Sequence, residues 1–320
     1  MEPRIRRIEH DDLPDLSVVI CTYNRPELLR LALTTLLRQS PANITYEVVV
    51  VDNNSTPETR AVVEEIAQSD SRVRYVRETR QGNAYARNTG VAEARAPIVA
   101  FLDDDVTVRD HWIEIIPRTF KETNADFIGG KVLPRWEQPP PSWLGVANWA
   151  PIAALDYGDA PVPLTADNPL CLLTANIAFK KELFAQHGEF SAAVQRTGDS
   201  IGSLEDHEFL MRLMRAGVAG LYVPEMIVDA FVGSDRMTKA YHRRWHTGHG
   251  HFYAVMNDVE WERSSYRLLG VPGHLYRETA RHAFAWFTRV LTGKTDAAFV
   301  NECRLRFFRG FLRQRMKNTR

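Results

Sequence analysis

Cysteine is scarce in this chain, and no long uncharged apolar run occurs in it. The three cysteines, Cys21, Cys171 and Cys303, are odd in number and far apart, which fits neither a disulfide framework nor a cysteine-based zinc site. No stretch of about 18 apolar residues lacks charges, so no membrane-spanning helix is expected. Residues 1–12 alternate basic and acidic side chains and do not have the pattern of a secretory signal peptide. We therefore expect reduced thiols and a cytoplasmic location.

The chain also has no formal net charge at pH 7. The 40 Lys and Arg residues balance 40 Asp and Glu residues, so no overall field attracts nucleic acid, and we expect no nucleic-acid partner. The chain has 320 residues, of which 44% are hydrophobic and 25% are charged. A chain of this length and composition can bury a sizeable core, as one large domain or as one domain with an appendage.

Apolar strands and helical periodicities alternate along the first hundred residues. The runs rich in β-branched or apolar residues, typical of buried strands, are 16–21, 46–51, 73–76 and 98–102. The segments between them that have the pattern of helices are 26–39, 57–68 and 84–94. This order predicts a Rossmann-like α/β fold with a mostly parallel central sheet flanked by helices. Ligands of such folds bind at the carboxyl ends of the strands.

The second half of the chain is less regular. We expect helices at 111–121 and 203–216, the latter opened by a capping box, and strands at 127–132 and 221–223. Residues 134–163 are rich in proline and tryptophan and predict a long ordered flap. Its tryptophans can cover the apolar face of a sugar ring, or they can fix the loop onto the core. Both interpretations stay open at this stage.

Three adjacent carboxylates, Asp103 to Asp105, follow the apolar strand 98–102. An acidic cluster at the end of a strand favours a cation with hard oxygen ligands, such as Mg²⁺ or Mn²⁺. Such an ion usually keeps open positions for the phosphates of a substrate. The alternative is an acidic turn without a ligand.

Five short motifs lie along this alternating pattern. The motifs are Val-Ile-Cys-Thr-Tyr-Asn-Arg at 19–25, Val-Val-Asp-Asn-Asn-Ser-Thr at 50–56, Gly-Asn with Ala-Arg-Asn-Thr-Gly at 82–90, Phe-Leu-Asp-Asp-Asp at 101–105 and Leu-Glu-Asp at 204–206. Together, and in this order, they resemble the family 2 glycosyltransferases, which have the GT-A fold. The resemblance extends from about residue 16 to about residue 223. The last hundred residues lie outside it.

The resemblance implies a division of the chain into three parts. These parts are an N-terminal arm at 1–15, a GT-A domain at 16–235 and a helical, Arg-rich C-terminal extension at 236–320. Within the GT-A domain, the nucleotide-sugar half would span about 16–105 and the acceptor half about 106–235.

The resemblance also implies residues for the donor side of the site. Asp105 would hold a divalent cation together with Asp103, Asp103 would also face the ribose or the sugar, and Asp104 would assist. The residues implied in binding the nucleotide sugar are Thr22, Tyr23, Asn24, Arg25, Asp52, Asn83, Arg87, Asp103 and Asp104. Two of them have structural alternatives, because Asp52 can form an Asx turn with the residues that follow it and Arg87 can be a solvated helix residue.

Asp206 is the candidate general base. A sugar hydroxyl is a poor nucleophile at neutral pH, so an inverting enzyme needs a carboxylate that takes its proton. The resemblance assigns this role to Asp206, with Glu205 in a supporting role. The alternative is that Asp206 only completes a capping box with Ser203. The positive end of the helix is expected to keep the Asp206 carboxylate ionised.

One position departs from the family pattern. Many relatives carry a histidine in the stretch that corresponds to 228–231, where it helps to hold the metal or the diphosphate, and this chain has Asp229 or Ala230 there. The nearby residues that could replace it are Asp229, His242 and His246. Alternatively, the substrate phosphates and water complete the shell of the metal. The four histidines between 242 and 251 lack a cysteine partner and the glutamate of a metalloprotease motif, which argues against zinc.

The C-terminal part, from about residue 239, has the pattern of helices and ends in a basic tail. The cationic residues of the tail are Arg304, Arg306, Arg309, Arg313, Arg315, Lys317 and Arg320. The apolar residues between them are Leu305, Phe307, Phe308, Phe311 and Leu312. Residues 304–320 can bind an anionic membrane surface, which would place the enzyme on the inner face of the membrane. They can equally form a terminal helix that packs on its own domain.

The function that these patterns favour is glycosyl transfer. The resemblance implies an inverting, metal-dependent enzyme that moves a sugar from a nucleotide-diphosphate sugar to the hydroxyl of a glycan or lipid-linked acceptor, in cell-surface polysaccharide or glycoconjugate synthesis. The alternatives are a catalytically silent module that binds a sugar nucleotide or a membrane, and a nucleotidyltransferase. An early Gly-rich phosphate loop with a basic end, which would favour the latter, is missing. The motifs specify the reaction class more firmly than the base, the sugar or the acceptor.

Overall fold

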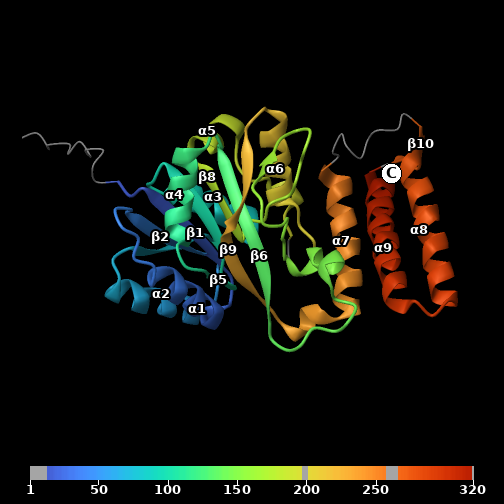
Figure 1. Ribbon diagram of the computed structural model, residues 1–320, viewed down its shortest axis with the longest axis horizontal. Coiled ribbons are helices and arrows are strands. Elements are labelled where there is room, and N and C mark those ends of the chain that lie inside the picture. Colours follow the sequence, from blue (N-terminus) through green and yellow to red (C-terminus); the bar gives the residue numbers. More distant parts are fainter. Residues whose placement is uncertain (1–12, 197–200, 257–265, 319–320) are drawn as a thin grey trace, which may run out of the picture.

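A computed structural model describes residues 13–196, 201–256 and 266–318 of the chain (Figure 1). Most of the expected N-terminal arm, residues 1–12, lies outside these ranges, and so does Arg320. A mixed α/β part holds the central sheet, and three long helices stand beside it at the C-terminal end (Figure 1). This arrangement confirms the predicted fold class. The exact borders at 15 and 235 stay a prediction.

The first half of the sheet is parallel, as predicted. Its strands, in spatial order, are β3 (Val73–Arg77), β2 (Tyr46–Asp52), β1 (Leu16–Thr22) and β4 (Ile98–Asp103). The helices that connect them are α1 (Pro26–Leu37), α2 (Pro57–Ser69) and α3 (Asn83–Glu93). All seven residues of β2 are buried, because a parallel strand is covered on both faces. In the register, Thr22 lies opposite Asp52 and Cys21 lies opposite Asp103, so the motif residues meet at one edge.

The second half of the sheet is mixed, so the expectation of a mostly parallel sheet holds only for the first four strands. Its strands are β5 (Val106–Val108), β6 (Phe127–Trp136), β7 (Val162–Leu164), β8 (Asn176–Lys180) and β9 (Gly220–Val232). β8 is antiparallel to both β4 and β6, whereas β6 runs parallel to β9. β5 and β7 pair with β9 in antiparallel fashion. Around this sheet lie the helices α4 (Trp112–Glu122), α5 (Glu182–His187) and α6 (Glu205–Arg215).

β6 and β9 are longer than the sequence pattern predicts. Their pairing continues from Phe127 to Trp136, with a shift of register between Gly130 and Lys131. A Cβ atom at Gly130 would lie 1.8 Å from the backbone oxygen of Met226, so only glycine allows this approach. The bulge lets both strands run on past the expected ends.

The flap is ordered, and its tryptophans take part in holding it. Two short 3₁₀ turns, Val146–Asn148 and Ala150–Ile152, are its regular elements before β7. Trp136, Trp143 and Trp149 pack against a small buried cluster. The cluster consists of Leu144, Ile152, Ala154, Val232 and Met237. The interpretation that the tryptophans hold the loop on the core is therefore confirmed.

The C-terminal part consists of α7 (Lys239–Met256), α8 (Gly273–Leu291) and α9 (Thr295–Asn318). α9 packs against both other helices (Figure 1). Cβ atoms at Gly250 and Gly310 would lie 2.0 and 1.9 Å from backbone oxygens of the facing helix, so α7 and α9 touch through their backbones. On its other side, α7 contacts the segment before α6, where a Cβ atom at Gly248 would lie 1.8 Å from the oxygen of Ile201. α7 is therefore fixed against the acceptor half.

The apolar residues of the basic tail face the protein interior. Phe307 and Phe311 are buried, and Phe308 and Leu312 pack against the same cluster. Side chains in this position cannot also insert into a membrane, so the structure favours the alternative of a packed terminal helix over the expected membrane segment at 304–320. Among the residues that the structure describes, no helix is long and apolar enough to cross a membrane.

Candidate active site

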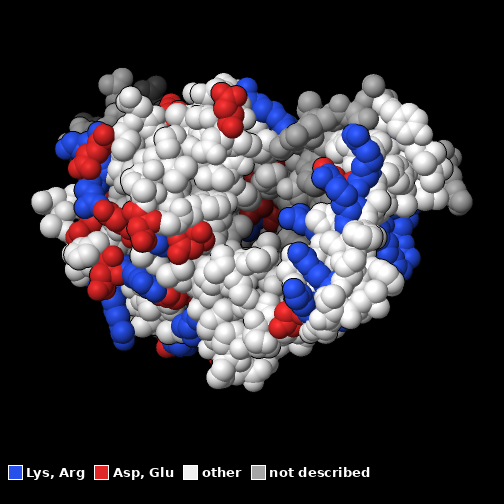
Figure 2. All heavy atoms as spheres, turned by 45° about the vertical axis from the view of Figure 1, so that its right-hand side comes forward, with Lys and Arg blue, Asp and Glu red and all other residues white. Residues whose placement is uncertain are grey.

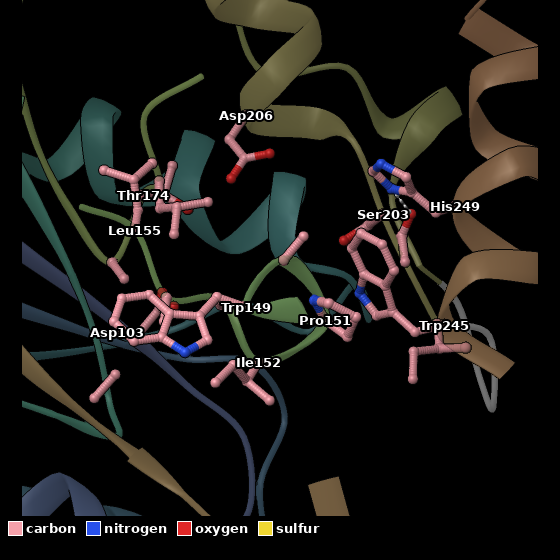
Figure 3. Close-up of a pocket in the computed structure, with 18 of the residues that line it drawn as sticks. Asp103, Trp149, Pro151, Ile152, Leu155, Thr174, Ser203, Asp206, Trp245 and His249 are labelled. Atoms are coloured by element: carbon pink, nitrogen blue, oxygen red, sulfur yellow. Dashed lines mark hydrogen bonds between the residues drawn. The ribbon is translucent and has the colours of Figure 1, made fainter. Parts of the chain in front are cut away.

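A cavity of about 1160 Å³ lies where the carboxyl ends of the strands meet the C-terminal helices. Figure 2 shows the surface hollowed between these two parts, with charged side chains inside. Residues from α3, from the end of β4, from the flap, from α6 and from α7 line it. In Figure 3, Asp206 from α6 and Trp245 from α7 point into the same space. The donor and acceptor halves therefore contribute to one site.

The acidic triplet is divided between the cavity and the protein interior. Asp103 and Asp105 line the cavity. Asp104 is buried, and its two oxygens accept hydrogen bonds from the Thr22 hydroxyl at 2.8 Å and from the Arg25 guanidinium at 3.0 Å. Burial raises the pKa of Asp104 to about 6. Asp104 therefore positions the triplet, and its two neighbours are available to a ligand.

Two arginines surround Asp105. Nη1 of Arg25 lies 3.1 Å from Asp105 Oδ2, and Nη1 of Arg236 lies 3.8 Å from the same oxygen. Arg236 belongs to a short 3₁₀ turn, Ser234–Met237, that follows β9. Sequence reasoning missed it, because nothing in the sequence indicates that the end of β9 returns to the acidic triplet.

The proposed replacements for the histidine of the family pattern lie outside the cavity lining. Asp229 points to the other face of β9, where it forms a double ion pair with Arg109 at 2.7 and 2.9 Å, and its neighbour Ala230 lines the cavity. His242 is fully buried against Trp143, and burial lowers its pKa to about 4. The prediction that Asp229 or His242 replaces the missing ligand is therefore wrong.

His246 is the third residue that the sequence offered as a replacement for the histidine. His246 is outside the cavity lining and stands edge-on to Trp245. Within the described ranges, no group of three or more His, Cys, Asp or Glu side chains is placed to hold a metal. This is compatible with a Mg²⁺ or Mn²⁺ ion held by two carboxylates, since such an ion takes its other ligands from substrate phosphates and water.

Arg87 connects the two halves of the site. Its Nη1 lies 2.6 Å from Glu205 Oε1, and its Nη2 lies 3.7 Å from Asp103 Oδ1. Arg87 is 6% exposed, so the alternative of a solvated helix arginine is wrong. Burial is the largest influence on the Glu205 carboxylate and raises its pKa, but the Arg87 charge and the hydrogen bonds to the carboxylate together outweigh it, so the pKa of Glu205 is lowered. Glu205 Oε2 is buried, although Glu205 as a residue lines the cavity, and the Ser203 side chain also contributes to the lowered pKa.

Asp206 also lines the cavity, in the first turn of α6. The N-cap of α6 is Leu204, without a side-chain cap, so the capping box with Ser203 is absent and that alternative for Asp206 is wrong. Asp206 accepts a hydrogen bond from the backbone N–H of His207. Burial, followed by the nearby Glu205 charge, raises the pKa of Asp206 to about 6. The effect of burial on the pKa of Asp206 is therefore larger than that of the positive helix end, which was expected to favour the ionised form.

The residues implied in nucleotide binding fall into two groups. Arg25, Asn83 and Arg87 line the cavity. The residues outside its lining are Thr22, Tyr23, Asn24 and Asp52. Thr22 holds Asp104, as described above. Tyr23 is 49% exposed, and Asn24 Oδ1 accepts a hydrogen bond from the backbone N–H of Thr56.

Both carboxylate oxygens of Asp52 accept hydrogen bonds from neighbouring groups of the protein. One of its oxygens accepts the backbone N–H of Ser55 at 2.8 Å, and the other accepts the Tyr75 hydroxyl at 2.6 Å. The bond to Ser55 reaches three residues along the chain, so it is a local turn contact related to the Asx turn that the sequence left as an alternative. With 2% of its surface exposed, Asp52 shapes the edge of the nucleotide half.

An aromatic wall on α7 was missed by sequence reasoning. Tyr241, Trp245, His249 and Tyr253 all line the cavity. They recur at every fourth position, so they form one row along the helix. The rings of Trp245 and His249 stack with centroids 4.1 Å apart (Figure 3). The four-residue spacing is the sequence pattern from which this row could have been predicted. Because the row lines the cavity, the C-terminal extension forms part of the site.

The chain has relatives among known proteins. The profile of glycosyl transferase family 2 matches residues 17–184, which is more than half of the chain. Glycosyltransferase AglE of Haloferax volcanii is 34% identical over 121 residues, a match that covers 38% of this chain and 40% of the relative. The succinoglycan biosynthesis protein ExoM of Rhizobium meliloti is 25% identical over 241 residues, 74% of each chain.

A solved structure has the same fold. The mannosyltransferase PcManGT of Pyrobaculum calidifontis, in complex with GDP-Man and Mn²⁺, superposes with a TM-score of 0.59 at 19% identity, over 91% of this chain and 86% of that one. At this identity the likeness shows the fold alone. Taken with the match of the family profile over 17–184, it leads to one conclusion: the chain belongs to glycosyl transferase family 2.

Proposed function

We propose that this protein transfers a sugar from a nucleotide-diphosphate sugar to an acceptor hydroxyl, with inversion at the anomeric carbon. The observation that carries this proposal is that Asp103, Asp105 and Asp206 line one cavity although they come from different halves of the chain. An inverting transfer needs a charge-neutralising station for the leaving group and a separate base for the acceptor. Asp103 and Asp105 are our candidates for the first, and Asp206 is our candidate for the second.

The donor station is suited to a divalent cation. Asp103 and Asp105 offer carboxylate oxygens to the cavity, the donor type that Mg²⁺ and Mn²⁺ prefer. Such an ion, held by these two residues, would neutralise the diphosphate leaving group. The complex of GDP-Man and Mn²⁺ with the Pyrobaculum protein supports this choice of ligands. Arg25, Arg87 and Arg236, which surround the carboxylates, can also contact the phosphates.

Asp206 is the proposed base, and Glu205 positions it. A pKa of about 6 leaves the Asp206 carboxylate mostly ionised at neutral pH and still basic enough to accept the hydroxyl proton. Glu205 lines the same cavity, so its carboxylate adds to the negative charge that surrounds the base. Arg87 keeps Glu205 ionised and therefore fixes the charge beside the base.

The aromatic wall of α7 is the proposed acceptor surface. Aromatic rings can cover the apolar face of a sugar and exclude water from the reacting atoms. Trp149 of the flap lines the same cavity, so the flap contributes to this surface as well as holding itself on the core. A saccharide acceptor agrees with the name of the Rhizobium relative, a succinoglycan biosynthesis protein. We propose a role in polysaccharide or glycoconjugate synthesis.

The proposal is tested by screening nucleotide sugars with Mn²⁺. A ligand that binds only the native protein raises its unfolding temperature by mass action, so one donor should raise it while the others have smaller effects. Release of the nucleoside diphosphate in the presence of saccharide acceptors then measures transfer. A donor that binds without any release of nucleotide, whatever the acceptor, would support the catalytically silent module instead.

A further inference from the structure

The outer side of α8 exposes a continuous stripe of large apolar side chains. Phe284 is 72% exposed, Phe287 is 55% exposed and Leu291 is 69% exposed. Because a helix turns by about 100° per residue, these three residues and Ala280 lie in one row along it. Val290 and Trp286, exposed by 45% and 36%, extend the apolar surface on one flank.

This stripe has no partner in the described residues. α8 packs mainly on α9, and Leu275 is its only buried residue. Soluble monomers rarely leave a large contiguous apolar patch uncovered, so such a patch indicates an interaction surface. The tail helix α9, whose phenylalanines are packed inward, does not offer a comparable surface.

Two exposed arginines flank the stripe on one side. Arg277 and Arg281 are exposed on the second flank of the stripe and form no ion pair with any described residue. Figure 2 shows that Lys and Arg outnumber Asp and Glu on the visible face of the helical part.

This combination identifies the chemistry of the partner. An apolar stripe flanked by arginines binds a bilayer interface, because the apolar side chains enter the acyl region while the guanidinium groups reach anionic head groups. A second copy of the chain would bring the same unpaired cations together. We propose that the outer face of α8, consisting of Phe284, Phe287, Val290, Leu291, Trp286, Arg277 and Arg281, docks the protein on an anionic lipid bilayer.

The test uses the full chain and vesicles of phosphatidylcholine, with or without phosphatidylglycerol. Wild-type protein should co-sediment with the anionic vesicles at low salt and much less with the neutral ones. The triple variant Phe284→Ser, Phe287→Ser, Leu291→Ser should need at least about tenfold more lipid for half binding, because most of the inserted apolar surface is lost. Arg277→Gln with Arg281→Gln should reduce the dependence on salt.

Two controls separate this role from misfolding and from the proposed activity. Leu31→Ser removes an apolar side chain of α1 that is 39% exposed, and it should bind lipid like the wild type. All variants change exposed residues, so they should unfold at nearly the wild-type temperature and show the same stabilisation by donor. Equal lipid binding by wild type and triple variant, or no lipid binding by the wild type, would overturn the proposal. Wild-type dimers that the triple variant cannot form would assign the surface to a second copy and overturn it as well.

Discussion

Arg87 and Glu205 form a buried ion pair across the two halves of the molecule, with 2.6 Å between Nη1 and Oε1. The residues are 118 positions apart, on α3 and α6. Both are almost fully buried, and Arg87 also faces Asp103 at 3.7 Å. One guanidinium group therefore faces a carboxylate from each half of the chain.

The first prediction concerns this pair. Arg87→Gln should lower the free energy of unfolding by about 3 kcal/mol or more, because it leaves the Glu205 carboxylate buried without its partner. Glu205→Gln in the same chain should restore part of the loss, since the remaining buried group is then neutral. Chemical denaturation of the single and double variants measures both effects. The matched control is Arg118→Gln, whose exposed pair with Glu225 should contribute little. A loss of stability no larger than that of the control would show that the pair is not structurally important.

The second prediction concerns the base. Asp206→Asn should bind the donor almost normally and lose transfer by at least about a hundredfold, the lower range for removal of general-base assistance. Glu208→Gln, which changes a carboxylate two residues further along α6 that does not line the cavity, is the matched control and should keep transfer. Near-normal transfer by Asp206→Asn would exclude Asp206 as the base. Donor binding is followed by the shift of the unfolding temperature, and transfer by release of the nucleotide.

The third prediction follows from the raised pKa of Asp206, about 6. The protonated carboxyl cannot accept the hydroxyl proton, and its share increases as the pH falls through 6. Transfer should therefore be nearly constant just above pH 7 and should fall about tenfold per pH unit well below 6. A pH profile of kcat/KM for the wild type measures this limb. The same profile for Asp206→Asn should lack it, and a limb that persisted in that variant would have to come from another group.

The fourth prediction concerns the cation. Stabilisation by the donor should require Mn²⁺ or Mg²⁺ and should disappear in EDTA. Asp105→Ala should abolish the metal-dependent stabilisation while the chain stays folded, because Asp105 is at the cavity and not in the core. Asp110→Asn, a change at an exposed carboxylate in the turn before α4, should leave it intact. Full donor binding and transfer in EDTA would contradict a metal-dependent mechanism.

Much of the donor half was predictable from the sequence. Four short apolar strands separated by helical periodicities predict the parallel order, because only parallel strands covered on both faces are apolar almost throughout. Asp103, Asp105 and Asp206 were placed at the site from their motifs, and the cavity contains all three. The different roles within the triplet were not visible in the sequence. They depend on Thr22 and Arg25, which lie about 80 residues earlier and turn Asp104 away from the cavity.

The acceptor side was decided by tertiary structure. The sequence by itself determined which residues the C-terminal helices contain. It also determined the alternation of strands and helices along the first half of the chain and the position of the acidic motifs, since these depend on local pattern. Tertiary structure decided which surfaces those helices cover. Close backbone contacts at Gly248 and Gly310 fix α7 between the acceptor half and α9, so its aromatic row faces the cavity and the phenylalanines of α9 are buried. The outer face of α8 is exposed for the same reason, because each helix can be covered only by neighbours that chain topology brings within contact distance.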